Sequence, residues 1–149
     1  MREMKKILSI FMSLMLLLSI VPVVNADELE PPVDDPIIPE YTVRYVPGGT
    51  GTQMTLYVTD ASITVRPRVT AGNLRVYDSG TIVSETVQVC ADIMGFSSYV
   101  YTINQIHANP VNISFYRSGA SIYAKFKIQV WAGSISNSTT SDYVTILIF

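Results

Sequence analysis

The run from Ser121 to Trp131 constrains the fold more than any other segment, because apolar and polar or aromatic residues alternate along it without a break. Five small or apolar residues fall on one side: Ile122, Ala124, Phe126, Ile128 and Val130. The five residues on the other side are Tyr123, Lys125, Lys127, Gln129 and Trp131. A period of two does not produce one face of a helix. The pattern therefore predicts a strand with one face in the core and the other toward water.

The composition extends this prediction to the rest of the chain. Residues 27–149 contain 40 Val, Ile and Thr residues but only 4 Leu, which favours strands over helices. Short β-rich runs alternate with turn residues, and we expect strands near 41–46, 53–59, 62–69, 74–77, 81–93 (one or two), 99–106, 111–116, 121–131 and 142–149. Residues 41–149 are thus predicted to form an all-β domain, a single antiparallel β-sandwich of about seven to nine strands, immunoglobulin-like in architecture.

Two of these strands carry additional positional information. Pro67 interrupts the apolar side of strand 62–69 and cannot donate a ladder hydrogen bond, which predicts an edge strand or a bulge. The final strand, 142–149, is apolar on both faces, which predicts a central strand that is covered on both sides.

The N-terminus has the three parts of a secretory signal peptide. A basic start is followed by the 15-residue run Ile7–Val21, interrupted only by serines, and then by Val24-Asn25-Ala26 before Asp27. The apolar run is shorter than the ~20 residues of a spanning helix. We expect cleavage after Ala26, a secreted mature chain and no transmembrane segment after cleavage.

Residues 27–40 form a separate segment between the signal peptide and the predicted domain. They contain six carboxylates, four prolines and no basic residue. Such a segment cannot bury a core, so it is predicted to be an acidic, Pro-rich disordered tail.

Few residues suit catalysis or metal binding. His107 is the single histidine, and its neighbours Ala108-Asn109-Pro110 predict a solvated turn rather than a catalytic site. Cys90 is the single cysteine, and the alternation around it places it opposite the core side as a small half-buried residue; an intermolecular disulfide is the alternative. One His and one Cys do not complete a zinc site, so no metal or cofactor is predicted.

Two groups of outward residues are candidate ligand sites. Arg66, Arg68 and Arg75 lie on non-core positions of adjacent strands and could bind an anionic cell-surface polymer. Tyr123 and Trp131 lie on the outward face of the clearest strand and could hold a polysaccharide. Nucleic acid is not an expected partner, because residues 27–149 hold 7 basic against 11 acidic residues.

The sequence therefore favours a secreted, non-enzymatic binding or adhesion module. One alternative is a small secreted hydrolase that uses the loop carboxylates Asp60, Asp78, Glu85 or Asp92. The second alternative is a small outer-membrane β-barrel, suggested by the alternating Tyr143, Leu147 and Phe149 at the end of the chain, although most predicted strands are shorter than such barrels need.

Overall fold

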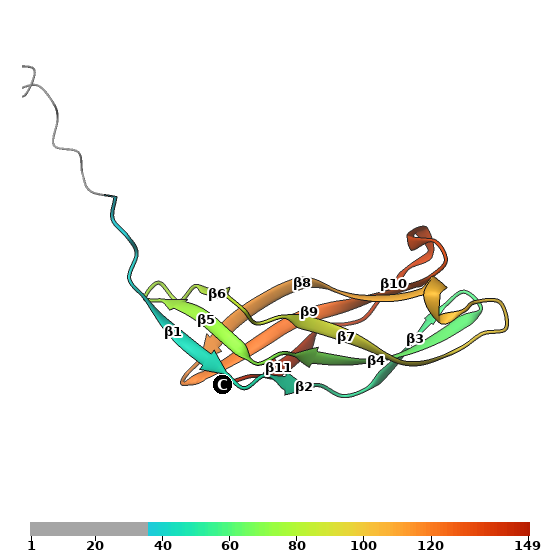
Figure 1. Cartoon of the computed structure of the whole chain (residues 1–149), viewed down its shortest axis with the longest axis horizontal. Helices are drawn as coiled ribbons and strands as arrows, with labels where there is room; N and C mark the ends of the chain where they lie inside the picture. Colours follow the sequence, from blue (N-terminus) through green and yellow to red (C-terminus); the bar gives the residue numbers. More distant parts are fainter. Residues whose placement is uncertain (1–35) are drawn as a thin grey trace, which may run out of the picture. The chain divides into compact units, whose positions relative to one another are not determined.

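The computed structural model describes residues 36–149, and Pro39–Phe149 form one compact unit (Figure 1). The predicted signal peptide and most of the predicted tail lie outside the described residues. Eleven strands and two short 3-10 helices make up the described part: β1 (Tyr41–Val46), β2 (Gly49–Thr50), β3 (Met54–Val58), β4 (Ala61–Val69), β5 (Gly72–Tyr77), β6 (Ile82–Ser84), β7 (Val89–Ser97), η2 (Ile103–Gln105), β8 (Ile106–Ser118), β9 (Ser121–Ala132), η3 (Ile135–Asn137), β10 (Thr139–Thr140) and β11 (Val144–Leu147).

Residues 41–97 form a long antiparallel meander that is divided into two sheets. The first sheet has the order β1-β5-β6, and in the second β4 pairs with β2 and β3 along one edge and with β7 along the other. Three chain segments, 41–58, 61–77 and 82–97, run side by side through both sheets. Their pairing is shown by the partners Tyr41↔Tyr77, Thr50↔Arg68, Val58↔Ala61, Val76↔Ile82 and Val69↔Val89.

Gly48 lies at the break between these two sheets. Its φ is 78°, in the left-handed region, and a Cβ at this position would lie 2.4 Å from the Val69 carbonyl oxygen. Only glycine fits such a close approach of two backbones at this φ. The glycine therefore allows the chain to leave β1 and enter β2 while it stays beside β4 and β5.

Residues 106–149 form the other layer, which we call the β9 layer. β8 pairs with one edge of β9, and β10 and β11 pair with successive stretches of the other edge. None of the sheets formed by residues 36–149 closes on itself.

One hydrophobic core lies between the meander and the β9 layer. It includes Ile63 and Val65 of β4, Leu74 of β5, and Phe126 and Ile128 of β9, all with no exposed surface. The burial of β9 alternates residue by residue, which confirms the face assignment made from the sequence. The predicted all-β class is confirmed, and the arrangement is sandwich-like, with eleven strands rather than seven to nine.

The prediction for Pro67 is confirmed only in part. β4 is not an edge strand, because it lies between β7 and the β2–β3 edge. The Pro67 carbonyl accepts a hydrogen bond from Gly51 N, so the missing Pro N–H points to the same side, where β2 has ended and β3 has not begun. The register shifts there from Thr50↔Arg68 to Met54↔Val65, so the irregularity is accommodated inside the sheet.

Three further sequence predictions are wrong. The expected strand 99–106 is instead a loop that ends in η2, and only Ile106 begins a strand. Residues 107–110 are not a turn but the start of β8, where Pro110 is tolerated because β8 pairs only with β9 and is an edge strand. The last strand is not central: β11 is an edge strand, which leaves Tyr143, Leu147 and Phe149 exposed.

Over residues 36–149, no helix has both the length and the apolar composition required to cross a bilayer.

Candidate binding surface

The outward face of the β9 layer carries a row of aromatic and lysine side chains, which we call the aromatic–lysine face. It consists of Tyr123, Lys125, Lys127, Gln129 and Trp131 of β9 with their outward neighbours on the flanking strands. The register sets these neighbours: Tyr116↔Tyr123, Ser114↔Lys125 and His107↔Trp131 on β8, and Leu147↔Tyr123 and Thr145↔Lys125 on β11. Because directly opposed residues of an antiparallel pair share a face, these side chains project together.

Each end of this face carries a cross-strand aromatic pair. Tyr116 and Tyr123 stack with their ring centroids 5.3 Å apart and an interplanar angle of 17°. His107 and Trp131 stack with centroids 5.0 Å apart at 22°. These separations lie in the range of favourable offset stacking. The two pairs are therefore held in place before any ligand arrives.

A β-bulge in β8 positions Tyr116. The register shifts between Val111 and Ser114, and Asn112 in this stretch has a φ of 54°. The extra residue exchanges the two faces of β8, so that Phe115 packs against the core and Tyr116 points outward. Without the bulge, Tyr116 would face the core.

Lys125 and Lys127 lie between the two aromatic pairs and share one partner. Their Nζ atoms lie 4.5 Å and 4.7 Å from the centroid of the Tyr143 ring. Both distances are within the range of a cation–π contact. Neither lysine takes part in either of the two salt bridges found among residues 36–149.

The three predicted arginines are distributed differently. Arg66 and Arg68 lie on the outward face of β4, whereas Arg75 lies on β5 in the other sheet of the meander. Arg68 donates two hydrogen bonds to the Asp92 carboxylate, at 2.7 Å and 3.1 Å. Arg75 donates to Glu85 from both Nε and Nη2, the shorter contact being 3.0 Å.

These ion pairs neutralise two of the three arginines. The hydrogen bond from Arg68 lowers the pKa of Asp92 below its ordinary value, and its Coulombic attraction adds to this effect. The hydrogen bonds to Asp92 and Glu85 raise the pKa of Arg68 and Arg75 in turn. Arg66 lies opposite Asp92 in the register and its charge also lowers the pKa of Asp92, but among residues 36–149 it forms no salt bridge and makes only a long contact of 3.5 Å to Gln53.

The four carboxylates proposed for a hydrolase lie on different segments of the chain. Asp92 and Glu85 are bound to arginines, and Asp60 and Asp78 occupy turns. Among residues 36–149, no group of three or more His, Cys, Asp and Glu residues could hold a metal ion.

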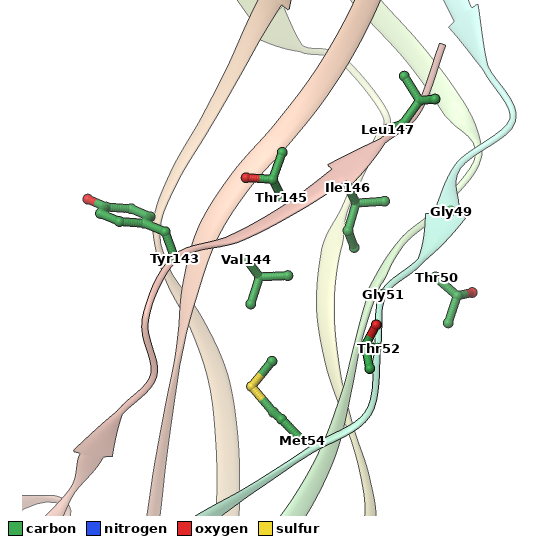
Figure 2. Close-up of a pocket in the computed structure, with 10 residues that line it drawn as sticks. All are labelled: Gly49, Thr50, Gly51, Thr52, Met54, Tyr143, Val144, Thr145, Ile146 and Leu147. Carbon is green, nitrogen blue, oxygen red and sulfur yellow. The ribbon is translucent and has the colours of Figure 1, made fainter.

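A groove of about 660 Å³ lies between the free edge of the β2–β3 segment and the free edge of β11 (Figure 2). Met54 and Val144 face each other across it, and Ile146 projects toward Gly49 and Gly51. A Cβ at Gly49 would lie 2.9 Å from the Ile146 side chain, so a larger residue there would force Ile146 to shift. All ten lining residues are uncharged.

A smaller groove of about 240 Å³ is lined by residues that include Arg44, Arg117 and Phe149. The Arg44 guanidinium lies 5.2 Å from the centroid of the Phe149 ring. Neither of these grooves is lined by an Asp or Glu side chain.

The two single residues named from the sequence have different outcomes. Cys90 is half-buried and pairs with Arg68 in the register, on the outward side of β7, which confirms its predicted face. His107 is not a turn residue but part of β8, stacked on Trp131.

The sequence alternation placed Tyr123 and Trp131 on the outward face but did not identify the residues that stack on them.

The sequence could not assign three residues of this face: Tyr143, Tyr116 and His107. Their positions depend on how the strands pair and, for Tyr116, on the bulge at Asn112. The available signal was the pair of lysines, since Lys125 and Lys127 are the only lysines in residues 27–149 and flank no acidic residue.

Comparisons with protein-family models, with curated proteins and with solved structures give no match to this chain.

Proposed function

We propose that the protein is a secreted, non-enzymatic binding module that holds a polysaccharide chain against the aromatic–lysine face. Secretion rests on the signal-peptide pattern of residues 1–26. The proposed domain is an immunoglobulin-like sandwich in architecture, and the face is the outer surface of one of its layers. The observation that carries the proposal is the pair of pre-stacked aromatic platforms at the two ends of β9.

The physical basis is the amphipathic nature of a sugar ring. A pyranose presents apolar C–H groups on its faces and hydroxyls around its rim, so that an aromatic side chain can cover the former while polar groups bind the latter. Burial of apolar surface contributes roughly 25 cal/mol per Å². The outward side chains near the platforms include Thr145 and Gln129; the Gln129 Nε2 donates to Ser138 Oγ, and its Oε1 and the Thr145 hydroxyl can hydrogen-bond to sugar hydroxyls.

A flat surface suits a polymer better than a small molecule. Small-molecule sites are concave and bury most of the ligand. The aromatic–lysine face is the exterior of a sheet and can instead contact an extended chain along the direction of β9. The binding energy is then distributed over several sugar units.

The direct test is co-sedimentation of the mature chain with insoluble polysaccharides. We expect Trp131→Ala and Tyr123→Ala each to weaken binding about tenfold or more, as is usual for aromatic anchors at binding surfaces. Tyr57→Ala is the matched control, because Tyr57 is 72% exposed on β3 of the other layer. Loss of binding in all three variants, or in none, would contradict the proposal.

A further inference from the structure

We propose that the ligand of the aromatic–lysine face is an anionic polysaccharide whose negative groups lie over Lys125 and Lys127. This inference rests on the proposed function, and it adds the charge of the ligand and the part of the face that recognises it.

The basic residues of the two layers differ in whether a carboxylate lies beside them. On the meander, Arg68 and Arg75 are each bound to a carboxylate, so their charge is already compensated. On the β9 layer, the ammonium groups of Lys125 and Lys127 lie near the Tyr143 ring and form no salt bridge within residues 36–149. The one acidic residue beside that ring in sequence, Asp142, takes part in neither salt bridge. The lysines therefore present uncompensated positive charge.

The two lysine ammonium groups converge on one aromatic ring. Both Nζ atoms lie within 5 Å of the centroid of the same ring, although the two residues carry like charges. Their separation is at most of the order of the Debye length, about 8 Å at physiological salt, so salt does not fully screen their repulsion. An anion placed between them would interact favourably with both ammonium groups and relieve this repulsion.

The two lysines lie between the aromatic platforms. Tyr123 and Trp131 are eight residues apart on β9, which corresponds to about 26 Å at 3.3 Å per residue. A ligand that contacts both platforms must span several sugar units and must cross Lys125 and Lys127. A polymer chain that contacts both platforms would therefore bring its negative groups close to Lys125 and Lys127.

An anionic polysaccharide fits these observations better than a nucleic acid does. The chain has more acidic than basic residues, 12 against 10, and the cations on this face are few. Nucleic-acid binding depends on a broad positive surface that displaces many counterions. Two lysines between aromatic platforms instead match a polymer of lower charge density with apolar ring faces.

The test compares two polymers that differ only in charge. Polygalacturonate carries a carboxylate on each sugar, and its fully methyl-esterified form has the same backbone without the charge. We expect the mature chain, beginning at Asp27, to bind polygalacturonate about tenfold more tightly at low salt, as two exposed ion pairs would give. The difference should fall as the salt concentration rises. Isothermal titration calorimetry measures both affinities.

The variant Lys125→Gln with Lys127→Gln should remove this preference while it keeps binding to the esterified polymer. Arg66→Gln with Arg68→Gln removes the same number of charges from the outward face of β4 and should change neither affinity. Equal weakening by both double variants would show that net charge alone is responsible and would overturn the inference.

The remaining outcomes separate the two proposals. Equal affinity of the wild-type chain for both polymers would overturn the anionic ligand but leave the polysaccharide module standing. Binding to inorganic polyphosphate as tight as to polygalacturonate would show that sugar rings are not needed and would overturn the inference as well. No binding to any of these polymers or to the insoluble polysaccharides would overturn both.

Discussion

The outward faces of the two layers have similar sheet geometry but use their basic residues differently. On the meander, Arg68 lies one strand away from Asp92 and Arg75 lies near Glu85, and both arginines form ion pairs. On the β9 layer, the lysines contact Tyr143 and no carboxylate within residues 36–149. Arg68 and Arg75 are thus compensated by carboxylates on the meander, whereas Lys125 and Lys127 are not compensated on the β9 layer.

This difference shows that the number of positive charges on a face is a poor guide to a site. From the sequence, the arginines of the meander form the larger basic cluster, but the fold pairs two of them, Arg68 and Arg75, with carboxylates. Exposed ion pairs of this kind contribute little to stability. A candidate anion site is better identified by cations that the fold leaves without a counter-charge.

The outward position of Lys125 and Lys127 depends on which face of β9 is buried. Phe126 is fully buried in the centre of β9, and Phe126→Ala should lower the free energy of unfolding by about 3–5 kcal/mol. Lys127, the next residue, points outward, and Lys127→Ala should cost less than about 0.5 kcal/mol. Urea denaturation of the two variants measures both effects. If Lys127→Ala were the more damaging, the faces of β9 would be inverted.

The second test concerns Gly48, which lies against the connection from β4 to β5, between Arg68 and Arg75 in the chain. A Cβ at Gly48 would overlap the Val69 carbonyl oxygen, and φ is positive there, so Gly48→Ala should cost more than about 2 kcal/mol. Gly80→Ala is the control, since Gly80 also has a positive φ but has no atom within 4 Å of a Cβ. It should cost only about 1 kcal/mol. Equal effects would mean that the close approach at Gly48 does not exist.

The sequence predicted the strands of this protein well where one face is buried and the other is not. The inner and outer residues of 121–131 and the outward position of Cys90 follow from a period of two. It failed at 99–106 and at 107–110, where β-forming residues such as Val100 and Tyr101 lie in a loop and Pro110 lies within a strand. Local propensity does not reveal whether a segment has a pairing partner.

The candidate surface was only partly predictable for the same reason. Tyr123 and Trp131 lie on one strand and were found from its alternation. Tyr116 reaches the same face only because of the bulge at Asn112, and Tyr143 reaches it because β11 pairs with β9. Likewise, the pairing of Arg68 with Asp92 depends on the register of β4 and β7, which the sequence does not give.

Stability should also respond differently to the loss of charge on the two faces. Asp92→Asn removes the partner of Arg68 and should lower the melting temperature slightly, whereas Lys125→Gln should leave it unchanged or raise it, because a like-charge repulsion is relieved. Thermal melts at low salt measure the two shifts. Destabilisation by Lys125→Gln as large as that by Asp92→Asn would mean that the contact between Lys125 and Tyr143 outweighs the repulsion between the two lysines.

The pH dependence of stability tests the Arg68–Asp92 ion pair in the wild-type chain. Because Arg68 lowers the pKa of Asp92, the pair contributes stability at pH values above the ordinary Asp range. That contribution is lost as the pH falls from the ordinary Asp pKa through the lowered folded value. The wild-type chain should therefore lose slightly more stability than Asp92→Asn between about pH 7 and about pH 3. Identical losses would show that the ion pair is not formed in solution.

The smallest expected effect is that of removing residues 27–40. Pro36–Glu40 are exposed and lie in no strand, and the whole segment offers little apolar surface to bury. A chain beginning at Tyr41 should melt within about one or two degrees of the chain that begins at Asp27. Removing six carboxylates should also strengthen polygalacturonate binding slightly at low salt, by long-range repulsion alone. A large fall in melting temperature would show that residues 27–40 belong to the folded state, and the outward faces would then have to be compared with that segment in place.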